Sequence, residues 1–207
     1  MNAASAKFSS AQADLRQELY TKVIRDTEIE IGKAYFLRKN GSIEMGMTFL
    51  PPDAPPGTPP AKIVQFKDGK GQMLTTGTGQ IDQASATGKN QAIAETMMTL
   101  GFGGTGTDLQ KSWMITDQGP DNLTDAGRTI SVEKLDLVPK DARISNTYSH
   151  VTIWVDLTRD VSLKQTFFIA SSGDTRTMIY SNIRLNQPVD VAPFALKCKG
   201  KCTIVNH

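Results

Sequence analysis

The feature that most constrains this fold is a series of short segments in which apolar and polar residues alternate, most clearly at residues 42–49 (SIEMGMTF). Every second residue there is apolar: Ile43, Met45, Met47 and Phe49. Alternation with a period of two predicts a β-strand with one buried face. The methionines have flexible thioether side chains, which suit a surface that adapts to varied apolar partners, although ordinary core packing also explains them.

Turn signals predict that this strand belongs to a run of hairpins. Asn40-Gly41 precedes it, and Asp68-Gly69 separates residues 61–67 from residues 72–75. Both dipeptides favour tight β-turns between antiparallel strands. Further strands are expected at residues 8–23, where a helix also fits, and at 28–37 and 80–86, with a loop at the proline-rich residues 51–60.

The second half of the chain predicts an antiparallel meander, because its strands are separated by short turns. The expected strands are 111–118, 129–139, 149–157, 162–171 and 175–185, with turns at 120–122, 139–141, 158–160 and 172–174. Residues 90–100 differ, since their apolar residues recur at helical spacing and Gly101 can end a helix. The expected fold class is therefore mainly β with a few helices.

Composition limits the class of protein. A length of 207 residues suits one domain, so we expect residues 1–207 to form a single unit. No apolar run approaches the roughly 20 residues that span a bilayer. The net charge is +2 and the basic residues are scattered, which argues against a nucleic-acid partner. No signal peptide is visible in the first residues of the sequence.

The sequence leaves open whether Cys198 and Cys202 form a disulfide. On a straight strand their Cα atoms would lie about 13 Å apart, which is too far for a bond. A tight turn at residues 199–201 brings them within reach. Two cysteines with His207 as the nearest histidine make a poor zinc site. If the two cysteines are bonded, an extracytoplasmic location is favoured.

Catalytic motifs are absent from the sequence, and we expect no enzyme, no cofactor and no metal. The two histidines are His150 and His207, and no serine stands in a G-x-S-x-G motif. Gly88-Lys89 is followed by Asn90, whereas a phosphate-binding loop needs Ser or Thr there. A hydrolase whose carboxylates meet only in space is the least favoured alternative.

The order of the segments resembles the LolA/LolB family of periplasmic outer-membrane lipoprotein carriers. The matching pieces keep the family's order from about residue 8 to residue 196. They are GKAYFLR at 32–38, KIVQFKDGK at 62–70, LVPKD at 137–141, IWVD at 153–156 and YSNI at 180–183.

This resemblance implies an incomplete antiparallel β-barrel, a strongly curved sheet with a helical lid over an apolar hollow. It also implies a non-catalytic, chaperone-like carrier in the periplasm that binds the acyl chains of lipoproteins or other lipids. Such a carrier receives cargo from an inner-membrane release complex and passes it to an outer-membrane acceptor. Arg38 matches the family arginine that hydrogen-bonds to the lid as a latch. We expect a monomer.

Alternation and resemblance together predict which side chains line the hollow. A shift of one residue would turn any strand's set to the other face. In the helix at 90–100, Ile93, Met97 and Leu100 are expected to fill the empty hollow and withdraw when lipid enters. The predicted lining is Phe36, Ile43, Met45, Met47, Val64, Phe66, Met73, Ile93, Met97, Leu100, Trp154 and Phe168.

One alternative uses the same fold without lipid transport, as an envelope sensory or protein-interaction module. A continuous cavity favours the carrier, whereas a hollow filled by side chains favours the module.

Overall fold

The computed structural model describes residues 6–39, 42–85, 100–125, 127–198 and 200–206. They form one continuous twelve-stranded sheet accompanied by two short helices and a 3-10 turn. The strands are β1 (Ser10–Thr21), β2 (Asp26–Lys39), β3 (Ser42–Phe49), β4 (Lys62–Lys67), β5 (Lys70–Thr75), β6 (Gln80–Ser85), β7 (Trp113–Asp125), β8 (Arg128–Pro139), β9 (Tyr148–Asp156), β10 (Val161–Ile169), β11 (Thr175–Leu185) and β12 (Thr203–Asn206). The helices are α3 (Gly106–Ser112) and α4 (Ala142–Ser145), and the turn is η1 (Ala192–Phe194).

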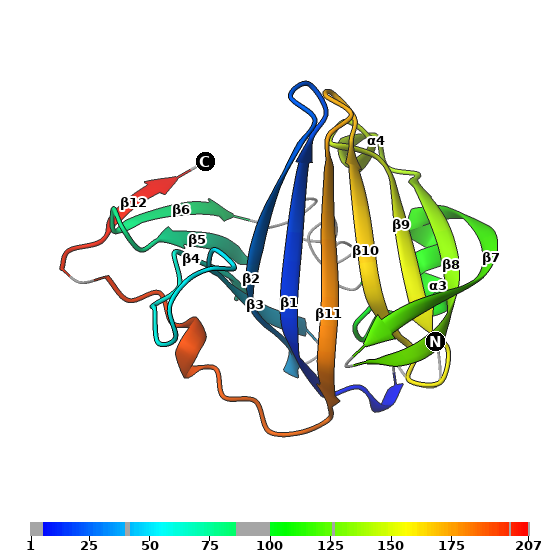
Figure 1. The fold of residues 1–207 in the computed structure, drawn as a ribbon, viewed down its shortest axis with the longest axis horizontal. Coiled ribbons are helices and arrows are strands. Elements are labelled where there is room, and N and C mark those ends of the chain that lie inside the picture. The colour runs from blue at the N-terminus through cyan, green and yellow to red at the C-terminus, as the bar shows by residue number, and fades with distance from the viewer. Residues whose placement is uncertain (1–5, 40–41, 86–99, 126, 199, 207) are drawn as a thin grey trace.

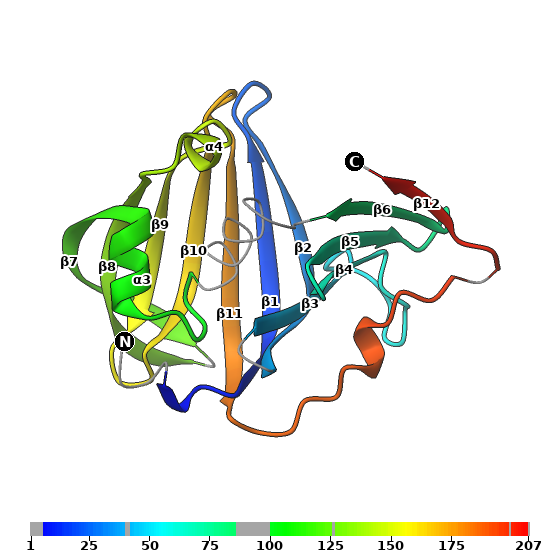
Figure 2. The same ribbon diagram turned by 180° about the vertical axis from the view of Figure 1, so that it is seen from behind.

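The strand order across the sheet is β12-β6-β5-β4-β3-β2-β1-β11-β10-β9-β8-β7. In Figure 1 the long strands β2, β1, β11 and β10 stand side by side, while β4, β5 and β6 run across them at one side. Seen from behind in Figure 2, α3 lies in front of β8 and β9. The sheet is therefore strongly curved and keeps two edges, β12 and β7, so the predicted incomplete antiparallel barrel is confirmed.

One local prediction is wrong. The turn expected at residues 120–122 lies inside β7, which continues to Asp125 after an irregularity between Asp117 and Gly119. A β-bulge accommodates the extra residue next to Gly119. Pro120 has no N–H to donate, but β7 is an edge strand with one neighbour, so the proline is tolerated there. The last strand, β12, pairs in parallel with β6, whereas every other pairing in the sheet is antiparallel.

The inner face of the sheet holds the main core. Val151, Ile153 and Val155 alternate along β9 and are almost completely buried. Each such side chain contributes about 1.5–3 kcal/mol by leaving water. Helix α3 adds Leu109 to this core, and its first turn is capped by the hydroxyl of Thr105. No helix among the described residues is both long and apolar enough to cross a membrane.

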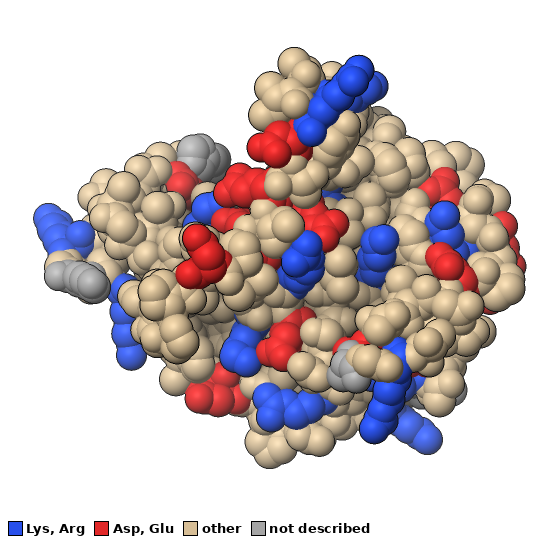
Figure 3. All heavy atoms as spheres, viewed as in Figure 1, with Lys and Arg blue, Asp and Glu red and all other residues tan. Residues whose placement is uncertain are grey.

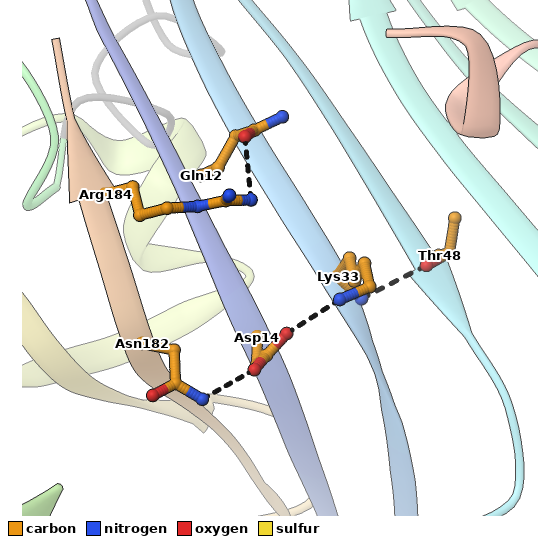
Figure 4. Close-up of polar contacts among 6 residues, drawn as sticks. All are labelled: Gln12, Asp14, Lys33, Thr48, Asn182 and Arg184. Atoms are coloured by element: carbon orange, nitrogen blue, oxygen red, sulfur yellow. Dashed lines mark hydrogen bonds and ion pairs between the residues drawn. The ribbon is translucent and has the colours of Figure 1, made fainter. Parts of the chain in front are cut away.

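The outer face of the central strands is polar. Lysines and arginines mingle with aspartates and glutamates over it in Figure 3. In Figure 4 a chain of hydrogen bonds crosses four strands: Asn182 on β11 and Lys33 on β2 both donate to Asp14 on β1, and the backbone N–H of Lys33 donates to Thr48 on β3. This face can therefore meet water, while the inner face is apolar.

A C-terminal strap, residues 186–198, covers the outer face of the strands at the other end. Phe194 packs edge-on against Tyr35, with ring centroids 4.7 Å apart. Farther along, Leu196 and the cysteines pack on a small cluster formed by Ile63, Leu74 and Ile81. Cys198 and Cys202 are joined by a disulfide, with their Cα atoms 5.6 Å apart. The tight turn that the sequence left open is thus formed, and it leads directly into β12.

Gly32 marks the closest approach of two strands. The backbone ladder between β2 and β3 is interrupted here, and a Cβ atom added to Gly32 would lie 1.7 Å from the carbonyl oxygen of Thr48. We expect Gly32→Ala to lower the free energy of unfolding by about 3 kcal/mol, because β2 and β3 must separate. Urea denaturation measures this change.

Gly71→Ala is the matched control, since the nearest atom to its added Cβ would lie 3.9 Å away. An equal effect of the two substitutions would contradict the close approach at Gly32.

Asp14 should make stability depend on acid pH. Partial burial raises its pKa, but the hydrogen bonds from Asn182 and Lys33 and the nearby positive charges outweigh it, so the pKa lies below the ordinary 3.8. A depressed carboxyl pKa in the folded state stabilises the fold above the unfolded-state pKa, and this stabilisation is lost as the pH falls. We expect wild type to be more stable than Asp14→Asn at pH 7, and the difference to shrink below about pH 4. Urea titrations at several pH values test this, and a difference independent of pH would contradict it.

Candidate functional site

The curved inner face encloses an open cavity of about 290 Å³, which we call the hollow. Strands from both halves of the chain contribute to it. Its lining residues are Gln17 and Leu19 of β1, Glu30 and Phe36 of β2, Met45, Met47 and Phe49 of β3, Lys62 and Val64 of β4, Met73 of β5, Tyr148 of β9, Gln165 and Phe167 of β10, and Arg176, Met178 and Tyr180 of β11.

Most of the lining is apolar and deformable. Four methionines and five aromatic rings face the hollow. Phe36 stacks on Phe102 at a centroid distance of 4.3 Å, and both rings contact Tyr180. Burial raises the pKa of the Tyr180 phenol, so this side chain stays neutral. Rigid rings and flexible thioethers together make a wall that can adjust to an apolar ligand.

The structure brings five of the predicted lining residues together at the hollow: Phe36, Met45, Met47, Val64 and Met73. Three others, Ile43, Phe66 and Leu100, are buried but do not line the hollow. Ile93 and Met97, with the helix predicted at 90–100, lie outside the described residues. Alternation identified β3 and β4 well, because one face of these strands is consistently apolar.

Trp154 and Phe168 point the other way, so their predicted inward orientation is a correction. Trp154 lies on the outer face, where its indole N–H donates to Asp121 at 2.8 Å and Lys164 sits over its ring. Phe168 stacks on His150 at 3.9 Å, while its neighbour Phe167 faces the hollow. In both strands apolar residues are adjacent in sequence, so the apolar pattern alone fits either orientation, and the prediction assigned the wrong residues to the inner face.

Sequence reasoning missed the polar end of the hollow. Glu30 is buried there and accepts hydrogen bonds from Gln17 at 2.7 Å and from Lys62 at 2.8 Å. Arg176 lines the same region from β11. Glu30 has the same parity as Phe36 on β2, so alternation places it on the inner face, but its charge kept it out of a lining predicted from apolar residues. Met178 and Tyr180 alternate with Arg176 on the inner face of β11, and the charge of Arg176 obscured this pattern in the same way.

Arg38 is tied to the segment that follows residue 99. Its guanidinium donates to the carbonyl oxygen of Gly103 and lies 5.8 Å from the ring centre of Phe8. A second tether holds the same segment, because the side-chain amide of Gln165 donates to the carbonyl of Leu100. Both contacts join the inner face of the sheet to residues 100–103, as a latch requires. The latch role itself stays a prediction.

The hollow offers little for catalysis. Glu30 is the one carboxylate among the described residues that line it, and Lys62 pairs with it. A carboxyl pair does exist elsewhere: a hydrogen bond with Asp117 raises the pKa of Glu133, but Asp117 on β7 is exposed, Glu133 on β8 is half-buried, and neither lines the hollow. Within the described part of the chain, no cluster of three or more His, Cys, Asp or Glu side chains could hold a metal ion.

Comparisons with known proteins bear on the fold. No family model and no curated protein sequence matches the chain. An uncharacterized conserved protein from Thermus thermophilus is similar in structure, with a TM-score of 0.55 at 9% identity over 99% of this chain and 96% of that one. This likeness shows the fold alone.

Two other solved structures are similar at lower scores. One is an outer membrane lipoprotein-sorting protein domain from Vibrio parahaemolyticus, with a TM-score of 0.46 and 12% identity over 93% of each chain. The other belongs to the Pseudomonas aeruginosa MucA/MucB complex, with a TM-score of 0.49 and 13% identity over 93% of this chain and 58% of that one. Scores under 0.5 carry no argument about function. The architecture observed here is nevertheless the one that the LolA/LolB resemblance implied.

Removing the Arg38 guanidinium should release residues 100–104. Arg38→Met deletes the hydrogen bond to Gly103, and we expect a loss of about 2 kcal/mol in unfolding free energy, the usual range for a hydrogen bond to a charged group. Amide hydrogen exchange of residues 100–104 should become faster than in wild type.

Arg16→Met serves as the control, because Arg16 makes an exposed bond to Glu18 on its own strand. Unchanged exchange in residues 100–104 of Arg38→Met would show that the contact does not hold this segment.

Proposed function

We propose that this chain is a periplasmic carrier that binds acyl chains of lipoproteins or other lipids in the hollow and takes them towards the outer membrane. The observation that carries the proposal is the open apolar hollow on the inner face of the sheet, lined by methionines and aromatic rings. A cavity left open between packed strands favours ligand binding over a purely structural module. Its volume of about 290 Å³ is near the lower end of ordinary ligand pockets, roughly 300–1,000 Å³.

The energetics suit a carrier. Each methylene group that leaves water contributes about 0.8 kcal/mol, so a 16-carbon chain gains on the order of 12 kcal/mol in a fully apolar site. A membrane offers the chain the same gain, and a carrier must therefore release its cargo as readily as it takes it. Arg38 supports such an exchange, because its single guanidinium links the sheet to residues that adjoin the predicted lid.

The proposed location and partners follow from the resemblance to the LolA/LolB family. A disulfide between Cys198 and Cys202 suits an oxidising compartment such as the periplasm. An inner-membrane release complex would load the carrier, and an outer-membrane acceptor would unload it.

A neutral apolar probe tests the hollow directly. N-phenylnaphthylamine should fluoresce on binding to wild type, and Met45→Trp should weaken its binding at least about tenfold, because the indole fills the space where the probe sits. Met45 is partly exposed at the hollow, so the larger side chain can enter without unpacking the core.

Met114→Trp is the matched control, since Met114 is 55% exposed on β7 and lies outside the hollow. No probe binding by wild type, or equal binding by both variants, would contradict the proposal. Native mass spectrometry of protein taken gently from its own envelope should then reveal a bound acylated mass.

A further inference from the structure

The polar end of the hollow is built around one buried carboxylate. The side chain of Glu30 is 8% exposed, and Lys62 and Gln17 each bind one of its two oxygens. A buried carboxylate needs hydrogen-bonding partners, and here each of its two oxygens has one donor. The cluster is therefore complete by itself and leaves the charge of Glu30 neutralised by Lys62.

Arg176 adds a second positive charge to this end. It is the second residue of β11, and its cross-strand neighbours are Leu19 on β1 and Phe167 on β10. Both neighbours are apolar and line the hollow with it. Within the residues that the structure describes, Arg176 has no ion-pair partner, although it stands diagonally across from Gln17. Among the residues that line the hollow, this end holds one carboxylate and two cations, so the lining itself carries a net positive charge.

We propose that the hollow selects an acyl chain that ends in an anionic head group, with the tail among the methionines and the head at Arg176. This inference rests on the proposed function, since it assumes that the hollow binds acyl chains. A guanidinium is suited to the role because its planar fork binds carboxylate or phosphate through two parallel hydrogen bonds.

The arrangement also sets how the ligand lies. The register pairs Arg176 with Leu19 and Met178 with Gln17, so the cation and the methionine are consecutive inward positions of β11. Tyr180 is the next inward residue along β11, and its ring packs edge-on against Phe36. A ligand with its head at Arg176 thus runs its chain along β11 towards Phe36. The free fatty acid and the lysophospholipid with one phosphate share this chemistry.

A pair of ligands that differ only in the head group tests the inference. Myristic acid and myristyl alcohol are titrated against bound N-phenylnaphthylamine, and the acid should displace the probe at a concentration at least about tenfold lower than the alcohol. Arg176→Gln should abolish this preference and leave the alcohol affinity unchanged. Arg176→Lys should retain part of it, because the charge remains but the fork is lost. Since Arg176 is exposed, the substitutions should not change the thermal midpoint of unfolding.

Arg184→Gln is the matched control. Arg184 lies on the same strand but bonds to Gln12 on the outer face, so its loss should leave the preference for the acid intact. Added salt should weaken binding of the acid and spare the alcohol. The same displacement titration with myristoyl lysophosphatidic acid shows whether phosphate is preferred to carboxylate.

The outcomes separate the two proposals. Equal affinity for acid and alcohol in wild type, or a preference that survives in Arg176→Gln, overturns head-group selection while the carrier stands. Failure of both ligands and of the probe to bind overturns the carrier, and the inference with it.

Discussion

The pairing of β1 with β11 joins the two halves of the molecule, and the hollow depends on it. The halves are antiparallel runs of strands, β1 to β6 and β7 to β11, each of which is built mainly from contacts between neighbours in sequence. Only the β1–β11 ladder, from Ala11 opposite Leu185 to Tyr20 opposite Thr175, unites them in one sheet. Gln17 and Leu19 then face the same space as Met178 and Arg176. Neither half alone would enclose the site.

Curvature is the second requirement, and the two faces of the curved sheet differ in polarity. The inner face carries large apolar side chains and accepts α3, whereas the outer face of the central strands carries hydrogen-bonded charges such as Asp14 and Lys33. At the other end, the strap seals the outer face with Phe194, and the disulfide leads into β12, which covers the exposed edge of β6. An edge strand left bare would pair with other chains, so this end of the chain protects the sheet as well.

The hollow combines an apolar part with a polar end, and the two parts have different roles in the proposed binding of a ligand. Its methionines and aromatic rings favour any apolar chain without specifying its length, because dispersion and burial are not directional. In the proposed selection its polar end discriminates, because a buried carboxylate with two donors and an exposed guanidinium carry charge there. The proposed binding therefore assigns affinity and selectivity to different residues.

Local sequence determined much of this protein. Period-two alternation and the Asp-Gly turn were sufficient for β3, β4 and β5, and the inward positions of Met45, Met47 and Val64 followed from them. Where two apolar residues are adjacent, as at Phe167 and Phe168, local pattern could not choose the face, and only pairing with β9 decided it. Tertiary structure alone decided the bulge in β7, the disulfide and the meeting of Glu30, Lys62 and Arg176. Glu30 and Lys62 meet through the pairing of β2, β3 and β4, and the pairing of β1 with β11 adds Arg176 from the other half of the chain.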